Sequence, residues 1–276
     1  MGGFVPEYNV NAYLLGLKIL IGVFVFLFGT VFGSFLNVLI YRLPLGLNFA
    51  KGSSFCPKCK HPLKWYDLFP LFSWIFLGGK CRYCKAKISP IYPVVESLNA
   101  VLWVLAYVFL CNAELSLALL GYCVACSALI VVFFIDWKHQ IIPDSMWITV
   151  LVGGVLVYIQ QLLDHGFVWQ ELVSRVVGFF LVSALLLILG LVYKGGIGGG
   201  DIKLMAAAGC LLGWRNVLVA LMFGAVIGVL YLGVTKSLKK SEMKKQVPFG
   251  PHLATGIVLS LYFADPLLNW YIGLWS

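Results

Sequence analysis

The chain has 276 residues, of which 61% are hydrophobic and 11% charged. Because soluble domains carry about 25% charged residues, this composition excludes an ordinary soluble protein and indicates one that crosses the membrane several times. The formal net charge of +9 is explained by membrane topology and anionic lipid. We therefore expect membrane lipid, and no nucleic acid, among its partners.

The spans can be predicted from apolar runs, since a transmembrane helix needs about 20 apolar residues. These runs predict an all-α polytopic membrane protein with about eight transmembrane helices, the first too long for a secretory signal. Segment 202–213 is short for a span, so seven spans and one re-entrant helix are the alternative. The predicted spans are residues 14–40, 91–111, 115–135, 145–163, 168–193, 202–213, 216–235 and 252–273.

Residues 43–90, which we call the cysteine loop, carry two C-x2-C pairs. Each pair offers two thiolates to one tetrahedral ion, and their separation is about that of a zinc ribbon. The sequence therefore predicts a structural zinc site in a small ribbon-like loop. Two disulfides are the alternative. The basic residues of the loop predict that it lies in the cytoplasm, a reducing compartment in which disulfides rarely persist. The two pairs are Cys56 with Cys59, and Cys81 with Cys84.

Three aspartates lie near membrane depth, where a carboxylate is costly and marks a candidate functional site. Asp136 follows span 115–135, and Asp201 closes a glycine-rich stretch. Because two spans form a hairpin between them, both side chains are expected at the same membrane face. Asp144 follows a proline at the start of the next span, so we expect it to cap that helix, with a catalytic role as the alternative.

The stretch GGIGGGDIKL, residues 195–204, places five glycines before Asp201. It is either a flexible connection or a loop open enough to admit a peptide, since Gly198 and Gly200 allow close approach of another backbone. Lys203 either favours the charged carboxylate or marks the membrane boundary. Two neighbouring carboxylates cannot easily both ionise, so Asp136 and Asp201 would supply a general acid and a general base.

Basic residues cluster on one predicted face of the membrane. Nine of the 20 Lys and Arg residues lie within residues 42–90, and eight more lie within connections 136–144, 193–203 and 236–247. Cytoplasmic connections are enriched in Lys and Arg, so this face is predicted to be cytoplasmic. Arg175 and Arg215 are the main exceptions.

Five motifs in order resemble the type IV prepilin peptidases, which are G-x-G-D intramembrane aspartic proteases. The resemblance covers nearly the whole chain. The motifs are GSFLNVLIYRLP at 33–44 with the paired C-x2-C loop after it, YPVVE at 92–96, IDWKHQIIPD at 135–144, GIGGGDIKL at 196–204 and PFGPHLATG at 248–256.

The resemblance implies a bifunctional enzyme of the bacterial plasma (inner) membrane whose active site faces the cytoplasm. It implies cleavage of the leader peptide from type IV prepilins or pseudopilins by Asp136 and Asp201. It also implies N-methylation of the new N-terminus with S-adenosylmethionine. Glu96 of the YPxxE motif is then a candidate for methyl transfer and cofactor binding; a structural ion pair with Arg42 is the alternative.

This interpretation divides the chain into three parts. Residues 1–42 form the first transmembrane helix, residues 43–90 the zinc-binding loop associated with methyl transfer, and residues 91–276 the protease core. Two other functions remain open. A transporter would use Asp136 and Asp201 as proton relays, and a non-enzymatic assembly factor would use the zinc ribbon to dock a partner.

Overall fold

The computed structural model describes residues 7–48, 50, 52, 54–56, 58–192, 198–238 and 248–275. The first part of the glycine-rich stretch, residues 195–197, lies outside the described residues. Five basic residues assigned to the predicted cytoplasmic connections also lie outside them, as does one in the cysteine loop. These are Lys194, Lys239, Lys240, Lys244, Lys245 and Lys51.

The predicted all-α membrane fold is confirmed. The eight α-helices of the described chain agree in number with the sequence, and six of its segments are long and apolar enough to cross a membrane. The agreement is not one to one, because the short α2 lies in the cysteine loop. The helices are α1 (Glu7–Arg42), α2 (Phe72–Phe76), α3 (Ile91–Leu105), α4 (Leu117–His139), α5 (Asp144–His165), α6 (Trp169–Val192), α7 (Gly199–Leu238) and α8 (Gly250–Gly273).

The predicted segments 202–213 and 216–235 are joined in one element, α7, which is interrupted at Gly213. Gly213 has φ 78° and ψ 171°, a backbone conformation that favours glycine. The buried Arg175 of α6 donates to the carbonyl oxygens of Cys210 at 2.6 Å and Leu211 at 3.2 Å, just before this break. This structural role explains why Arg175 departs from the charge pattern of the membrane faces.

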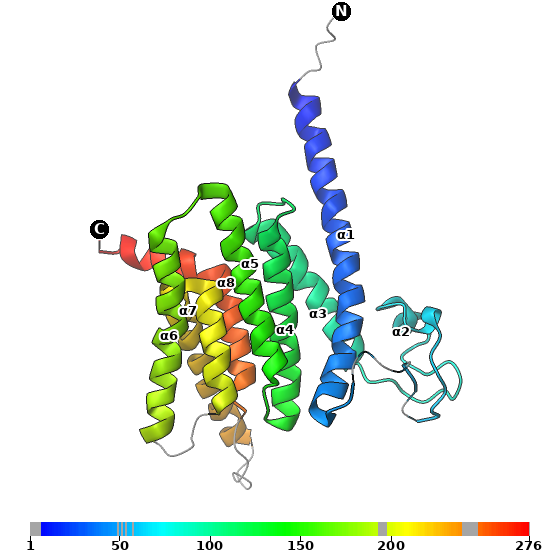
Figure 1. The fold of residues 1–276 in the computed structure, drawn as a ribbon. Coiled ribbons are helices and arrows are strands. Elements are labelled where there is room, and N and C mark those ends of the chain that lie inside the picture. The colour runs from blue at the N-terminus through cyan, green and yellow to red at the C-terminus, as the bar shows by residue number, and fades with distance from the viewer. Residues whose placement is uncertain are drawn as a thin grey trace, which may run out of the picture.

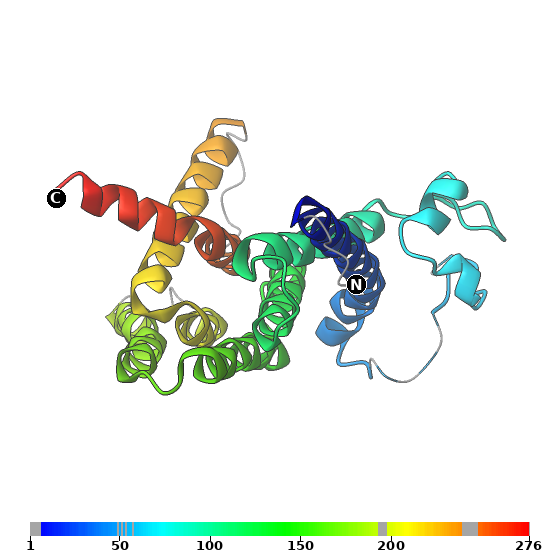
Figure 2. The same ribbon diagram turned by 90° about the horizontal axis from the view of Figure 1, so that it is seen from above.

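Helices α4 to α8 form a group that we call the C-terminal bundle (Figure 1). Viewed from above, α1 and α3 stand together beside α4, and the cysteine loop lies on their outer side (Figure 2). Small residues bring the bundle helices close together. A Cβ atom on Gly153 of α5 would lie 2.6 Å from the carbonyl oxygen of Gly121 in α4, and one on Gly154 would lie 2.8 Å from the backbone nitrogen of Leu211 in α7.

The chain alternates in direction so that several helix ends meet at one end of the bundle (Figure 1). The C-terminal end of α4 and the N-terminal ends of α5, α7 and α8 lie there, at the end to which α1 also descends. The described parts of the connections rich in Lys and Arg are therefore at one end of a multi-pass protein.

Candidate functional site

Two buried carboxylates lie where α4 ends and α7 begins. Asp136 is in the last turn of α4 and is 6% exposed, and Asp201 is the third residue of α7 and is 9% exposed. The structure thus brings these two sequence-predicted residues to the same end of the bundle. They are close enough to interact electrostatically.

Ile142, Gly200 and Gly250 lie around the two carboxylates. We call these five residues the aspartate site: Asp136, Ile142, Gly200, Asp201 and Gly250. The backbone N–H of Gly250 donates to Asp136 Oδ2 at 3.0 Å. A Cβ atom on Gly250 would lie 2.6 Å from that oxygen and 3.1 Å from Ile142 Cδ1. A Cβ atom on Gly200 would also meet this side chain, at 2.8 Å from Ile142 Cβ.

The described glycines before Asp201 have different surroundings. Gly198 accepts a hydrogen bond from the Asp201 backbone at 3.1 Å, and its Cβ position lies 3.2 Å from Asp201 Oδ2. Gly200 packs against Ile142, whereas a Cβ atom on Gly199 would meet nothing within 4 Å. Gly198 therefore lies against Asp201 and Gly200 against Ile142, whereas Gly199 has open space beside it.

Asp144 does not cap α5, so that expectation is wrong. Pro143 occupies the cap position in an extended conformation, and Asp144 is the first helical residue. Its Oδ1 instead accepts hydrogen bonds from Lys203 Nζ at 2.7 Å and from Trp147 Nε1 at 2.8 Å. Lys203 therefore pairs with Asp144, not with Asp201, and joins α7 to α5 at an exposed position.

Gly250 and Ile142 are contributors that sequence reasoning did not single out. Both lie inside quoted motifs, PFGPHLATG and IDWKHQIIPD, so a signal was present. Gly250 reaches Asp136 because α8 packs against α4, which no local pattern specifies. Ile142 lies in the connection between α4 and α5.

The four sequence-predicted thiols of the cysteine loop come together. Their sulfur atoms all lie within 4.8 Å of one another, and Cys56 Sγ lies 3.9 Å from Cys84 Sγ. A tetrahedral ion with metal–sulfur bonds of about 2.3 Å requires sulfur separations of about 3.8 Å. The thiols therefore fit one tetrahedral metal ion. The four are Cys56, Cys59, Cys81 and Cys84.

Each half of the thiol cluster is a small turn held by backbone hydrogen bonds. Lys60 donates to the Cys56 carbonyl at 2.8 Å, and Lys85 donates to the Cys81 carbonyl at 2.9 Å. Both lysines have positive φ, 59° and 58°, so the two turns share one geometry. A backbone hydrogen bond from Cys59, opposed by burial, lowers the pKa of the Cys56 thiol to about 7. This favours the thiolate that binds metal.

One acidic side chain ties the two halves of the cysteine loop together. Asp67 accepts hydrogen bonds from Arg82 Nε at 2.6 Å and from Tyr83 Oη at 3.1 Å. Although burial favours the neutral acid, the bond from Arg82 lowers the pKa of Asp67. The ring of His61 packs on Tyr83 with centroids 3.7 Å apart. These contacts connect the segment between the cysteine pairs to the second cysteine turn.

Glu96 attaches the cysteine loop to α3. Its buried carboxylate accepts a hydrogen bond from the backbone N–H of Leu71 at 2.8 Å, just before α2. The ion pair expected with Arg42 is wrong for the part of the chain that the structure describes. Arg42 donates instead to the carbonyl oxygens of Asn48 and Gly52.

Comparisons with known proteins identify the family. Residues 27–110 match the Bacterial Peptidase A24 N-terminal domain, and residues 123–233 match the Type IV leader peptidase family. No solved structure matches the chain.

Three relatives are each named prepilin leader peptidase/N-methyltransferase. The protein from Aeromonas salmonicida is 32% identical over 90% of this chain and 93% of its own length. The one from Legionella pneumophila is 33% identical over 96% of this chain and 99% of its own length. The one from Bacillus subtilis is 32% identical over 90% of this chain and 96% of its own length. The chain therefore belongs to the type IV leader peptidase family.

Proposed function

We propose that this protein is a prepilin leader peptidase and N-methyltransferase of the bacterial inner membrane. It cleaves the leader from type IV prepilins or pseudopilins at the cytoplasmic face and methylates the new N-terminal residue with S-adenosylmethionine. The names of the full-length relatives support both activities. The observation that carries the proposal is the convergence of Asp136 and Asp201 at the end of the bundle where the basic connections lie.

The two carboxylates have the chemistry that peptide hydrolysis requires. One ionised aspartate removes a proton from water, whose oxygen then bonds to the scissile carbonyl carbon. The other, protonated, polarises the carbonyl oxygen. The carbon–nitrogen bond then breaks, and a proton passes to the leaving amine. The Gly250 N–H orients one oxygen of Asp136 for this work.

For the cysteine loop we propose a structural zinc ion held by all four thiolates, which leaves no open coordination position for catalysis. The proposed division of the chain is residues 1–42, 43–90 and 91–276, with methyl transfer associated with the second part. Glu96 supports that part by holding Leu71. Direct contact of Glu96 with S-adenosylmethionine stays a prediction.

The test of the proposed peptidase is incubation of purified variants with a prepilin. We expect Asp136→Asn and Asp201→Asn each to abolish leader cleavage, because asparagine keeps the shape of the side chain but cannot exchange a proton. Asp164→Asn is the matched control, since Asp164 is an exposed carboxylate that accepts a hydrogen bond from Gln160, near the other end of α5. Normal cleavage by both site variants would exclude the aspartate mechanism.

A further inference from the structure

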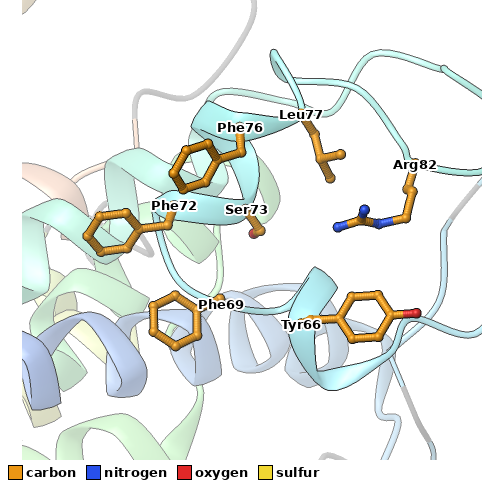
Figure 3. A pocket seen from close by; sticks show the side chains of 7 residues that line it. All are labelled: Tyr66, Phe69, Phe72, Ser73, Phe76, Leu77 and Arg82. Atoms are coloured by element: carbon orange, nitrogen blue, oxygen red, sulfur yellow. The ribbon is translucent and has the colours of Figure 1, made fainter.

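An apolar stretch interrupts the otherwise basic cysteine loop. Four of its side chains are largely exposed: Phe76 at 84%, Ile75 at 63%, Phe69 at 54% and Phe72 at 46%. Figure 3 shows the three phenylalanines together at one side of a pocket in the loop. Clustered exposed aromatic residues of this kind mark an interaction surface.

The position of α2 fixes the level at which this stretch lies. The backbone N–H of Leu71, next to α2, donates a hydrogen bond to the carboxylate of Glu96, which lies in the second turn of α3. The spanning segment that contains α3 begins at Ile91. Figure 1 accordingly shows α2 beside α1 and not beyond its end, and Figure 2 shows the loop on the outer side of α3, away from the C-terminal bundle. An element held beside the start of the span that contains α3 lies close to the membrane boundary.

A groove continues from α2 along the outer face of α3. It has a volume of about 520 Å³ and is almost entirely apolar. The groove reaches Val101, about 15 Å along the helix axis from Ile91 at 1.5 Å per residue. The surface of α2 is therefore continuous with the lipid-facing surface of the span. The lining residues are Trp74, Pro90, Pro93, Val94, Ser97, Leu98 and Val101.

The charges of the cysteine loop fit a negatively charged membrane surface. Residues 43–90 contain eight basic residues after Arg42 and a single acidic residue, Asp67, which is paired with Arg82. Basic residues next to a span are attracted to anionic headgroups. An apolar face flanked by lysines is the pattern of an element that lies in the membrane interface.

We propose that residues 69–76, which we call the α2 anchor, are inserted into the bilayer leaflet on the side of the cysteine loop. An anionic phospholipid occupies the groove between Trp74 and α3, with its acyl chain along Leu98 and Val101. The basic side chains of the loop face the headgroups. The anchor thereby holds the thiol cluster against the membrane, independently of the reaction at the aspartate site.

The test is site-specific photo-crosslinking in the full-length protein. Phe76→p-benzoylphenylalanine places the probe at the most exposed position of the anchor and keeps an aromatic ring there. Phe180→p-benzoylphenylalanine, in the exposed face of α6, is the positive control. Asp164→p-benzoylphenylalanine, exposed at the far end of α5 and away from the basic loop, is the negative control. The proteins are irradiated in bilayers of phosphatidylethanolamine and phosphatidylglycerol, and lipid adducts are measured by mass spectrometry.

We expect a lipid adduct at Phe76 comparable in yield to that at Phe180 and many times that at Asp164. Replacing phosphatidylglycerol by phosphatidylcholine should lower the yield at Phe76 more than at Phe180, because only the former depends on the basic loop. A lipid adduct at Phe180 but none at Phe76 would overturn the proposal. An adduct of Phe76 with added prepilin in place of lipid would also overturn it and would assign the surface to a protein partner.

Discussion

The aspartate site and the thiol cluster differ in the sequence separation between the residues that meet in them. Asp136 and Gly250, which share a hydrogen bond, are 114 residues apart, and the two meet only because α8 packs against α4. Cys56 and Cys84 are 28 residues apart and are positioned by two backbone turns and the Asp67 bonds. Packing of whole helices thus builds one site, and local hydrogen bonding builds the other.

This difference predicts that the two regions fail separately. A substitution that disturbs helix packing beside Asp201 should remove peptidase activity and leave the thiol cluster intact. A substitution in a cysteine turn should have the opposite effect. The four changes that follow test this separation, in order of decreasing expected effect.

The largest effect is expected from Gly200→Ala. Its Cβ atom would lie 2.8 Å from Ile142 Cβ, so the start of α7 must shift and displace Asp201. A shift of about 1 Å at a catalytic group costs roughly a hundredfold in rate, so we expect a loss of this order in prepilin cleavage. Gly199→Ala is the control, because its Cβ atom meets nothing within 4 Å. Equal losses in the two variants would contradict the packing argument.

Cys59→Ser should empty the cysteine loop of metal and keep cleavage. We expect elemental analysis to find about one zinc per chain in the parent protein and none in the variant, since serine does not replace a thiolate ligand. The loop lysines should also become more sensitive to trypsin, because folding of such sites is coupled to metal binding. Parent protein purified without chelators and free of metal would contradict the zinc assignment.

Glu96→Gln should have a smaller effect, confined to methylation. The amide oxygen still accepts the hydrogen bond from Leu71, but a neutral acceptor is weaker than a carboxylate by about 1 kcal/mol. The methylation rate should fall severalfold relative to the parent protein, and the cleavage rate should not change. Both rates are measured with the same prepilin. A parallel fall in both rates would show that Glu96 supports the whole protein.

Asp144→Asn should have the least effect on cleavage. Asp144 and Lys203 form an exposed pair, and exposed pairs contribute little. Asparagine also keeps the oxygen that accepts from Trp147. If this variant loses cleavage while Asp136→Asn retains it, the assignment of the catalytic pair is wrong.

The helices could be predicted from sequence because hydropathy depends on composition within a segment. The predicted span 168–193 corresponds to α6, Trp169–Val192, and the predicted span 145–163 to α5, Asp144–His165. The clustering of the four thiols was also predictable. The two cysteines of each C-x2-C pair are close in the chain, and one tetrahedral ion needs both pairs as ligands.

Contacts between distant segments could not be predicted in this way. The pairing of Lys203 with Asp144 depends on how α5 packs against α7, and a local capping rule gave the wrong partner. The bond from Leu71 to Glu96 depends on a positive φ of 60° at Leu71, a conformation that leucine rarely adopts. Neither contact has a signature in the residues next to it.

The central claim is that the C-terminal bundle cuts the leader while the cysteine loop supports methylation. Mass spectrometry of the pilin N-terminus tests it directly, after one prepilin and S-adenosylmethionine are incubated with Asp201→Asn or with Cys59→Ser. We predict an intact leader with Asp201→Asn, and a shortened pilin with reduced methylation with Cys59→Ser. A shortened pilin with Asp201→Asn, or loss of both activities together with Cys59→Ser, would contradict the account.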